Sequence, residues 1–174
     1  LKVAEEHIKA GMSTYELDMI LREFYRSQGA KPSFLGYGGF TGSACISIND
    51  EVIHGIPSKT KIIRDGDIVK VDTGAYIDGF HGDNAINAAT FAVGEVSDEA
   101  KKLMDVTEQS LYEGIRMAKV GNRIGDISHA IEEYVTSRGY AVVKKFVGHG
   151  VGHELHESPE VPNYGHAGKG VRLA

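Results

Sequence analysis

The sequence contains little that could crosslink the chain, anchor it in a membrane or charge it strongly. Cys45 is the only cysteine, which excludes an intrachain disulfide and indicates a reducing compartment such as the cytoplasm. No apolar run approaches the ~20 residues that span a membrane, and no signal peptide is visible. The net charge is −5 without a basic block, which argues against nucleic acid and membranes as partners. The 174 residues are enough for one domain with a hydrophobic core.

Helical and strand-like patterns predict an α+β fold, with an antiparallel sheet and helices on one side. The first helix starts at the capping box Ser13-Thr14-Tyr15-Glu16 and ends before Gly29. In the second helix, Leu111, Ile115 and Ala118 share one apolar face. Helices are predicted at about 13–28, 97–119 and 125–138, and strands at 44–48, 51–54, 68–77, 80–91 and 140–147.

A hairpin with two aspartates is the first candidate site. Asp78-Gly79 is a strong two-residue turn signal, and it makes the numbers of facing residues sum to 157. Asp72 is then predicted to face Ala85, with Asp83 one diagonal step away on the same face of the sheet. Two converging carboxylates repel each other unless a proton or a cation lies between them. The pattern therefore indicates a metal site, although both aspartates could instead face water.

The chain repeats itself. A shift of 110 residues aligns Gly11 with Gly121 and Gly29 with Gly139, and a shift of 102 aligns His54-Gly55-Ile56-Pro57 with His156-Glu157-Ser158-Pro159. The repeat predicts a pseudo-twofold fold with repeats of about 1–93 and 97–174 and a site between the halves. The second copy of the hairpin would begin near Ala174. We therefore expect one incomplete domain that is cut at both ends.

Histidines and a glycine-rich loop add to the candidate site. His149 lies between two glycines, where it could bind a metal or only hydrogen-bond to backbone. With the two aspartates it suits Mn²⁺, Fe²⁺, Co²⁺ or Zn²⁺. His54 and His156 could be acid–base groups or oxyanion donors, or could only shape turns. His81 points to the face of Asp83. The aromatic residues of the loop 34–40 could wall a pocket or fill the core, whereas His7, His129, His153 and His166 are expected to be surface or structural residues.

Three segments together resemble type I methionine aminopeptidase, and the resemblance covers nearly the whole chain. They are 47–57 (SINDEVIHGIP), Asp72 with 80–83 (FHGD), and 148–157 (GHGVGHELHE). The resemblance implies the duplicated pita-bread fold and a dinuclear metal centre that activates water to remove N-terminal methionine from peptides and nascent proteins.

The resemblance also implies roles for single residues. Asp72 would bind one of two divalent ions, Asp83 would bridge both, and His149 would bind the other. His54 would lie near the scissile amide, and His156 would hydrogen-bond the substrate carbonyl and the tetrahedral intermediate. The methionine pocket would be lined by Phe34, Tyr37, Phe40, Cys45 and Leu155.

One departure from the family pattern bears on activity. The family site needs two further glutamates, and no residue between His156 and Ala174 matches them. The 174-residue chain is therefore expected to be nearly inactive, to bind metal weakly and to self-associate through an uncovered face. The alternatives are a proline-specific aminopeptidase or dipeptidase of the same fold, a non-catalytic binding module, and a soluble core without a site in this region.

Overall fold

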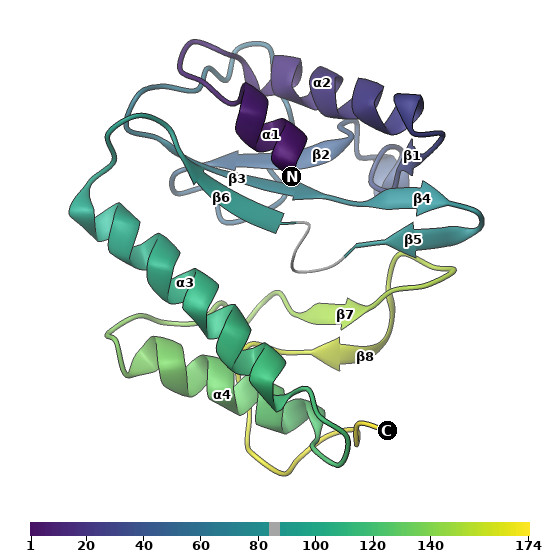
Figure 1. The fold of residues 1–174 in the computed structure, drawn as a ribbon, viewed down its shortest axis with the longest axis vertical. Helices are drawn as coiled ribbons and strands as arrows, with labels where there is room; N and C mark the ends of the chain where they lie inside the picture. Colours follow the sequence, from purple (N-terminus) through teal and green to yellow (C-terminus); the bar gives the residue numbers. More distant parts are fainter. Residues whose placement is uncertain (84–87) are drawn as a thin grey trace. The chain divides into compact units, whose positions relative to one another are not determined.

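The chain forms four helices and short antiparallel strands within the residues that the computed structural model describes, 1–83 and 88–174 (Figure 1). These residues divide into two compact units. Unit 1 comprises Leu1–Lys101 and Val151–Leu155, and unit 2 comprises Lys102–Gly150 and His156–Ala174. In the described part of the chain, no helix combines the length and apolar character needed to cross a bilayer.

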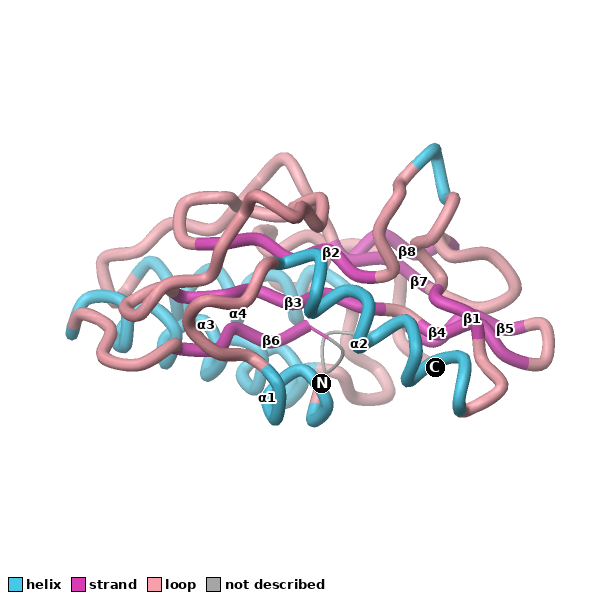
Figure 2. Tube along the Cα trace, turned by 90° about the horizontal axis from the view of Figure 1, so that it is seen from above, coloured by secondary structure: helices cyan, strands magenta, loops and turns pink. Residues whose placement is uncertain are grey.

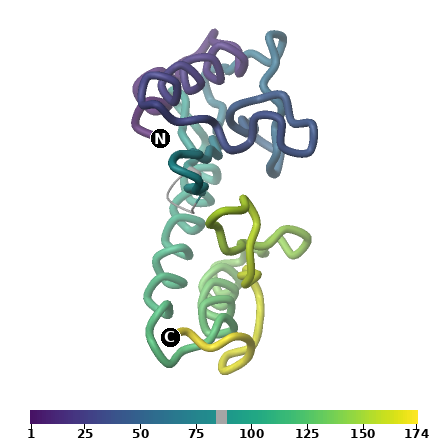
Figure 3. Tube along the Cα trace, turned by 90° about the vertical axis from the view of Figure 1, so that its right-hand side faces the viewer, coloured from purple at the N-terminus to yellow at the C-terminus, as the bar shows by residue number. Residues whose placement is uncertain are grey.

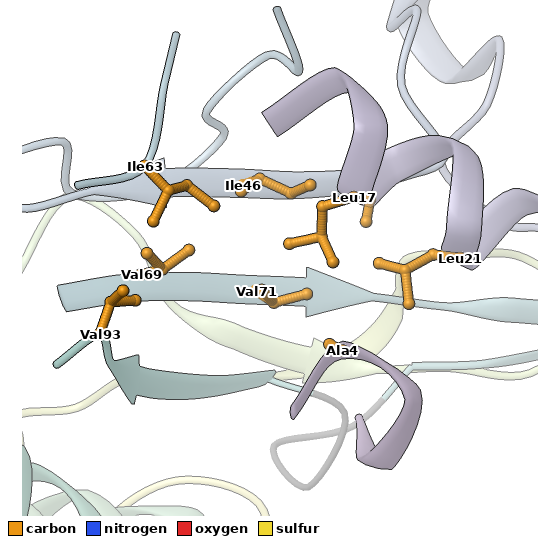
Figure 4. Packing of buried hydrophobic residues seen from close by; sticks show 9 residues of the cluster. Ala4, Leu17, Leu21, Ile46, Ile63, Val69, Val71 and Val93 are labelled. Atoms are coloured by element: carbon orange, nitrogen blue, oxygen red, sulfur yellow. The ribbon is translucent and has the colours of Figure 1, made fainter. Parts of the chain in front are cut away.

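Unit 1 is built on a three-stranded antiparallel sheet of β2 (Ala44–Ile48), β3 (Ile68–Thr73) and β6 (Ala88–Ala92), in that spatial order (Figure 2). Helices α1 (Lys2–His7) and α2 (Thr14–Ser27) pack their apolar side chains against it. Leu17 and Leu21 of α2 point toward Val71 of β3 in the core (Figure 4). Each such buried side chain contributes about 1.5–3 kcal/mol, so the sheet and its two helices form a rigid base for the candidate site residues of β2 and β3.

The predicted start of α2 is confirmed. The Ser13 amide donates to the Glu16 carboxylate at 2.8 Å, and the Glu16 amide donates to Ser13 Oγ at 3.2 Å. Beyond the helix, Gly29 has φ +71°, as a residue that ends a helix often does. Helix α2 also holds Asp18, a buried carboxylate that sequence patterns did not single out.

A second, smaller sheet joins β1 (Lys31–Pro32), β4 (Ala75–Ile77) and β5 (Phe80–Gly82). Its turn is the predicted Asp78-Gly79, with φ of 52° and 87°, and Ala75 pairs with Gly82 in the predicted register. Farther from the turn the register prediction is wrong, because Asp72 pairs with Ala88. Ala85, its predicted partner, lies outside the described residues. The offset between the two pairings lets the smaller sheet separate from the larger one.

The predicted strand 51–54 is wrong. The chain turns back after β2, because the Glu51 carboxylate accepts the Ile48 amide at 2.8 Å and pairs with Lys61 at 2.5 Å. His54 then adopts φ +59°, a left-handed conformation that an extended strand excludes. Gly55 rests on β2, where its carbonyl accepts the Ile46 amide at 2.9 Å and its amide donates to Ser47 Oγ at 3.0 Å.

Unit 2 contains most of α3 (Asp98–Met117), α4 (Ile124–Thr136) and the antiparallel pair β7 (Gly148–Gly150) and β8 (Glu157–Val161). The predicted apolar face of α3 is not the buried one: Ile115 is 48% exposed, and the buried residues are Val106, Ser110 and Gly114. A Cβ on Gly114 would lie 2.8 Å from Ile131 Cδ1, so α3 approaches α4 closely through its small side chains. The short side chains explain why apolar periodicity alone points to the wrong stripe.

A small 3₁₀ turn, η1 (Tyr37–Gly39), follows β1 in the glycine-rich loop of unit 1. In unit 2, the predicted strand 140–147 is wrong: these residues have no strand partner in the described chain, and β7 begins only at Gly148. A β-branched run becomes a strand only where a neighbouring strand accepts its backbone hydrogen bonds, and most of this run faces solvent.

Backbone hydrogen bonds repeat at the predicted shift of 110 residues. Gly11 donates to Ile63 at 2.8 Å, and Gly121 donates to Leu173 at 3.0 Å. Thr14 donates to Lys61 and Ile124 to Val171, both at 2.9 Å. The last residues of the chain thus return to the turn between α3 and α4, which Figure 3 shows at the yellow end of the trace. The two copies share their architecture at the start of α2 and of α4.

Candidate active site

The two predicted aspartates of unit 1 lie near one buried thiol. Cys45 of β2 pairs with Asp72 of β3, so their side chains share one face of the sheet. Burial raises the pKa of Cys45 to about 12, and the charges of Asp72 and Asp83 add to this effect. The structure therefore places Asp72 opposite Cys45 on the neighbouring strand, and the charge of Asp83 also acts on the thiol, although the predicted strand register is partly wrong.

The charges of the same two carboxylates also act on Tyr25. Its hydroxyl lies 2.5 Å from Thr73 Oγ1, at the end of β3. Burial raises the pKa of Tyr25, the hydrogen bond to Thr73 opposes the shift, and the charges of Asp72 and Asp83 raise it again. A buried thiol and a half-buried phenol thus experience the same pair of negative charges, which is the electrostatic setting in which a cation binds.

An apolar cluster adjoins these carboxylates through Cys45. Phe34, Cys45 and Leu155 are buried together, and Phe40 packs against them. These are four of the five residues predicted to line a methionine pocket. The fifth, Tyr37, is 52% exposed in η1. Leu155 reaches the cluster because residues 151–155 belong to unit 1.

His81 and His54 lie in unit 1 with different surroundings. His81 Nδ1 lies 2.9 Å from Ser33 Oγ in a hydrogen bond, and its ring is 4.7 Å from that of Tyr76. Ser33 directly precedes Phe34, so His81 links the hairpin to the apolar cluster. His54 is exposed and is held in its left-handed conformation by the bonds of Gly55 to β2. A non-glycine residue at positive φ is costly and is often found at a functional site.

The remaining two histidines lie together in unit 2. The ring centroids of His149 and His156 are 4.1 Å apart. His149 Nδ1 lies 2.8 Å from the Gly150 carbonyl oxygen, which can only accept, so Nδ1 carries the proton. In this tautomer Nε2 is the nitrogen with the lone pair, and histidine ligands of metals typically make such a hydrogen bond through the nitrogen that does not bind the metal.

The predicted ligand set fits a divalent metal by its chemistry. Two carboxylates and a neutral imidazole are donors that Mn²⁺, Fe²⁺, Co²⁺ and Zn²⁺ accept. Asp72 and Asp83 belong to unit 1 and His149 to unit 2. Among residues 1–83 and 88–174, no three or more His, Cys, Asp and Glu side chains gather closely enough to hold a metal ion.

Two residues of this region were not identified from the sequence. Ser33 gave no signal, because a single serine before an aromatic residue is common. His153 was expected only to be a surface or structural residue; it is exposed, its Nδ1 donates to the Gly79 carbonyl at 3.0 Å, and its ring lies 4.1 Å from that of Phe80. Only the contact between distant segments reveals it.

Comparison with known proteins places the chain in a family. Metallopeptidase family M24 matches residues 1–174. Methionine aminopeptidase of Clostridium acetobutylicum is 53% identical over 173 residues, which cover 99% of this chain and 68% of that protein. Methionine aminopeptidase 1 of Bacillus subtilis is 52% identical over 169 residues, which cover 97% of this chain and 66% of that protein.

Structural comparison agrees with the sequence match. The crystal structure of methionine aminopeptidase from Thermotoga maritima has a TM-score of 0.95 and 44% identity, covering 99% of this chain and 68% of that one. The predicted α+β pita-bread fold is thereby confirmed. The chain spans about two thirds of the length of these relatives. Its sequence and its fold both show that the chain belongs to metallopeptidase family M24.

Proposed function

We propose that this chain is the part of a methionine aminopeptidase that binds the N-terminal methionine of a peptide. One observation carries the proposal: Cys45 belongs to the apolar cluster of unit 1 and at the same time pairs with Asp72 on the neighbouring strand, where the charges of Asp72 and Asp83 both act on it. An N-terminal methionine has the matching chemistry, with an unbranched apolar side chain next to an amine and a scissile carbonyl. The homologues named methionine aminopeptidase support the same substrate.

The pocket would select methionine by shape. Phe34, Leu155 and Phe40 offer apolar surface, and Cys45 contributes a neutral thiol because its pKa lies far above physiological pH. Each methylene that fills or misses such a pocket changes discrimination by about 1–3 kcal/mol. Tyr37 at the exposed turn would contact the substrate at the rim.

Asp72, Asp83 and His149 are the proposed ligands of two divalent ions, with Co²⁺, Mn²⁺, Fe²⁺ and Zn²⁺ as candidates. When bound, such ions lower the pKa of water and polarise the substrate carbonyl. The carboxylates of Asp72 and Asp83 also attract the amino group of the substrate. The Nδ1–H bond of His149 to Gly150 keeps Nε2 in its ligand form.

His54 and His156 act on the substrate in this proposal. The bonds of Gly55 to β2 fix the backbone beside His54, which holds its imidazole ready for the scissile amide. His156 packs against the ring of His149 and donates a hydrogen bond to the substrate carbonyl oxygen as negative charge develops on it.

The 174 residues by themselves would release methionine slowly, if at all. The family pattern includes two glutamate ligands that no residue between His156 and Ala174 matches. The test is therefore made twice, on this chain and on the chain completed with the parts of the Clostridium acetobutylicum relative that the match leaves uncovered. Release of methionine from Met-Ala-Ser is measured with Mn²⁺ or Co²⁺ in each.

The proposal expects release by the completed protein, loss of release on Asp83→Asn, and little release by the 174 residues. An Xaa-Pro dipeptide serves as the second substrate. Faster cleavage of this dipeptide would indicate a proline-specific enzyme instead of a methionine aminopeptidase. A completed, folded protein that cleaves neither peptide with either metal would overturn the proposal and favour a non-catalytic binding module.

A further inference from the structure

Residues 151–155 pack onto the β4–β5 hairpin of unit 1. They lie in sequence between His149 and His156, two residues of the proposed site, but belong to unit 1 rather than to unit 2. In Figure 1 this segment follows β7 and runs beside β5. The contacts that hold it there decide how freely the chain on either side can move.

Contacts of three of its residues hold the segment. The His81 amide of β5 donates to the Gly152 carbonyl at 2.7 Å. His153 Nδ1 donates to the Gly79 carbonyl at 3.0 Å, and its ring lies against the Phe80 ring at 4.1 Å with a 31° tilt. Leu155, only 2% exposed, is buried with Phe34 and Cys45. The segment is therefore fixed at its middle by a side chain and at its end by burial.

At the turn of the hairpin, His153 makes the contacts that depend on a particular side chain. Gly79 and Phe80 occupy the tip of the hairpin, where Phe80 is 51% exposed. The Gly152 bond needs only backbone and would form with any residue at 153. The imidazole adds a hydrogen bond and an aromatic contact, and each of these stabilises a pair of groups by a modest amount.

We propose that His153 is a positioning residue that latches residues 151–155 onto the β4–β5 hairpin and so restrains the segment that carries His149 and His156. The inference rests on the proposed function, since that function assigns roles to the two flanking histidines. A restrained segment loses less conformational freedom when His149 binds a metal, which strengthens metal binding without a direct contact to the ion. His153 itself touches neither substrate nor metal in this role.

Hydrogen exchange of the His81 amide tests the latch directly, because this N–H exchanges only when Gly152 moves away. In metal-free protein, His153→Ala should speed its exchange about tenfold and Phe80→Leu about threefold. The His81 amide of the double variant should exchange only slightly faster than that of His153→Ala, because both substitutions remove the same ring contact. The Gly11 amide, bonded to Ile63, is the internal reference and should not change.

His7→Ala is the matched control. Its Nδ1 also bonds to a backbone carbonyl, that of Val3 at 2.8 Å, but within α1. Titration with Mn²⁺ then tests positioning: His153→Ala should raise the Kd three- to tenfold, and His7→Ala should leave it unchanged.

Unchanged exchange at His81 in His153→Ala would overturn the latch. Faster exchange with an unchanged Kd would overturn the positioning role. Wild-type protein that binds no Mn²⁺ would count against the proposed function, and the exchange rates would still decide whether the latch exists.

Discussion

Gly55→Ala is the sharpest perturbation that the structure offers beside His54. A Cβ on residue 55 would lie 2.2 Å from the Ile46 carbonyl oxygen, 2.6 Å from the Ile46 carbonyl carbon and 2.8 Å from Ser47 Cα. All three atoms belong to the backbone of β2 and cannot rotate away. The loop at residue 55 must therefore withdraw by roughly 1 Å or more to reach normal contact distances.

Withdrawal breaks two buried hydrogen bonds. The Gly55 carbonyl loses the Ile46 amide at 2.9 Å, and the Gly55 amide loses Ser47 Oγ at 3.0 Å. A buried polar group left without a partner costs about 1–3 kcal/mol. We expect the free energy of unfolding to fall by about 2–5 kcal/mol, and the proposed metal-dependent activity of the completed protein to fall as His54 moves.

Urea denaturation followed by circular dichroism and tyrosine fluorescence measures the change, since the chain contains no tryptophan. Gly82→Ala is the control, because a Cβ there meets only the Ala75 carbonyl at 3.8 Å. Its stability should stay within about 0.5 kcal/mol of wild type. A Gly55→Ala protein as stable as the control would refute the close approach of this loop to β2.

Three further predictions concern buried groups of unit 1. Burial raises the pKa of Asp18 above its usual 3.8 despite the bonds that it accepts, so the folded chain binds a proton more tightly than the unfolded chain. Its contribution to stability is present below pH 3.8 and is lost as pH rises through the raised pKa. Asp18→Asn should therefore remove this part of the pH dependence of the free energy of unfolding, as acid denaturation curves measure. The same pH dependence in both proteins would contradict the prediction. Cys45, with a pKa raised from 9.0 to about 12, should react with iodoacetamide at pH 8 about a thousandfold more slowly than in urea, as mass spectrometry can measure; similar rates would show that the thiol is not buried beside the carboxylates. Leu155→Ala should lower the free energy of unfolding by about 2–4 kcal/mol, because Leu155 is almost fully buried, and in the completed protein it should raise KM for methionine peptides; an unchanged KM would remove Leu155 from the pocket.

Local signals in the sequence were sufficient where a structure depends on neighbouring residues. The Ser13–Glu16 capping box and the Asp78-Gly79 turn are both observed, since each needs only a few consecutive residues. The repeat at a shift of 110 was also visible and recurs in backbone hydrogen bonds. Of these features only the repeat indicated the duplicated organisation, and the pita-bread fold itself was implied by the family resemblance.

Features that depend on distant partners were not predictable. Residues 51–54 look like a strand, but the bonds of Glu51 to Ile48 and Lys61 turn the chain away. The register change between Asp72 and the hairpin depends on how two sheets separate, which no short pattern encodes. In α3, close approach to Ile131 selects Gly114 for burial over the more apolar Ile115.

The residues of the candidate site also divide into those that the sequence predicts and those that depend on distant contacts. Asp72 and Asp83 could be chosen from their residue types and spacing, whereas Cys45 was implied only by the family resemblance; in the structure the charges of both carboxylates act on the Cys45 thiol. His153 could not, because its role depends on a contact with Gly79 and Phe80 across about seventy residues. Contacts of this kind restrain a site without belonging to it, so they leave no motif.

Binding of Mn²⁺ to the 174-residue chain tests the central claim most directly, that Asp72 and Asp83 are ligands of a divalent metal. Titration followed by electron paramagnetic resonance compares wild type with Asp72→Asn, Asp83→Asn and the matched control Asp78→Asn at the turn, where asparagine tolerates the φ of 52°. The account predicts weak but measurable binding by wild type and Asp78→Asn, and a Kd raised about tenfold or more in the other two. Equal affinity in all four proteins would contradict it.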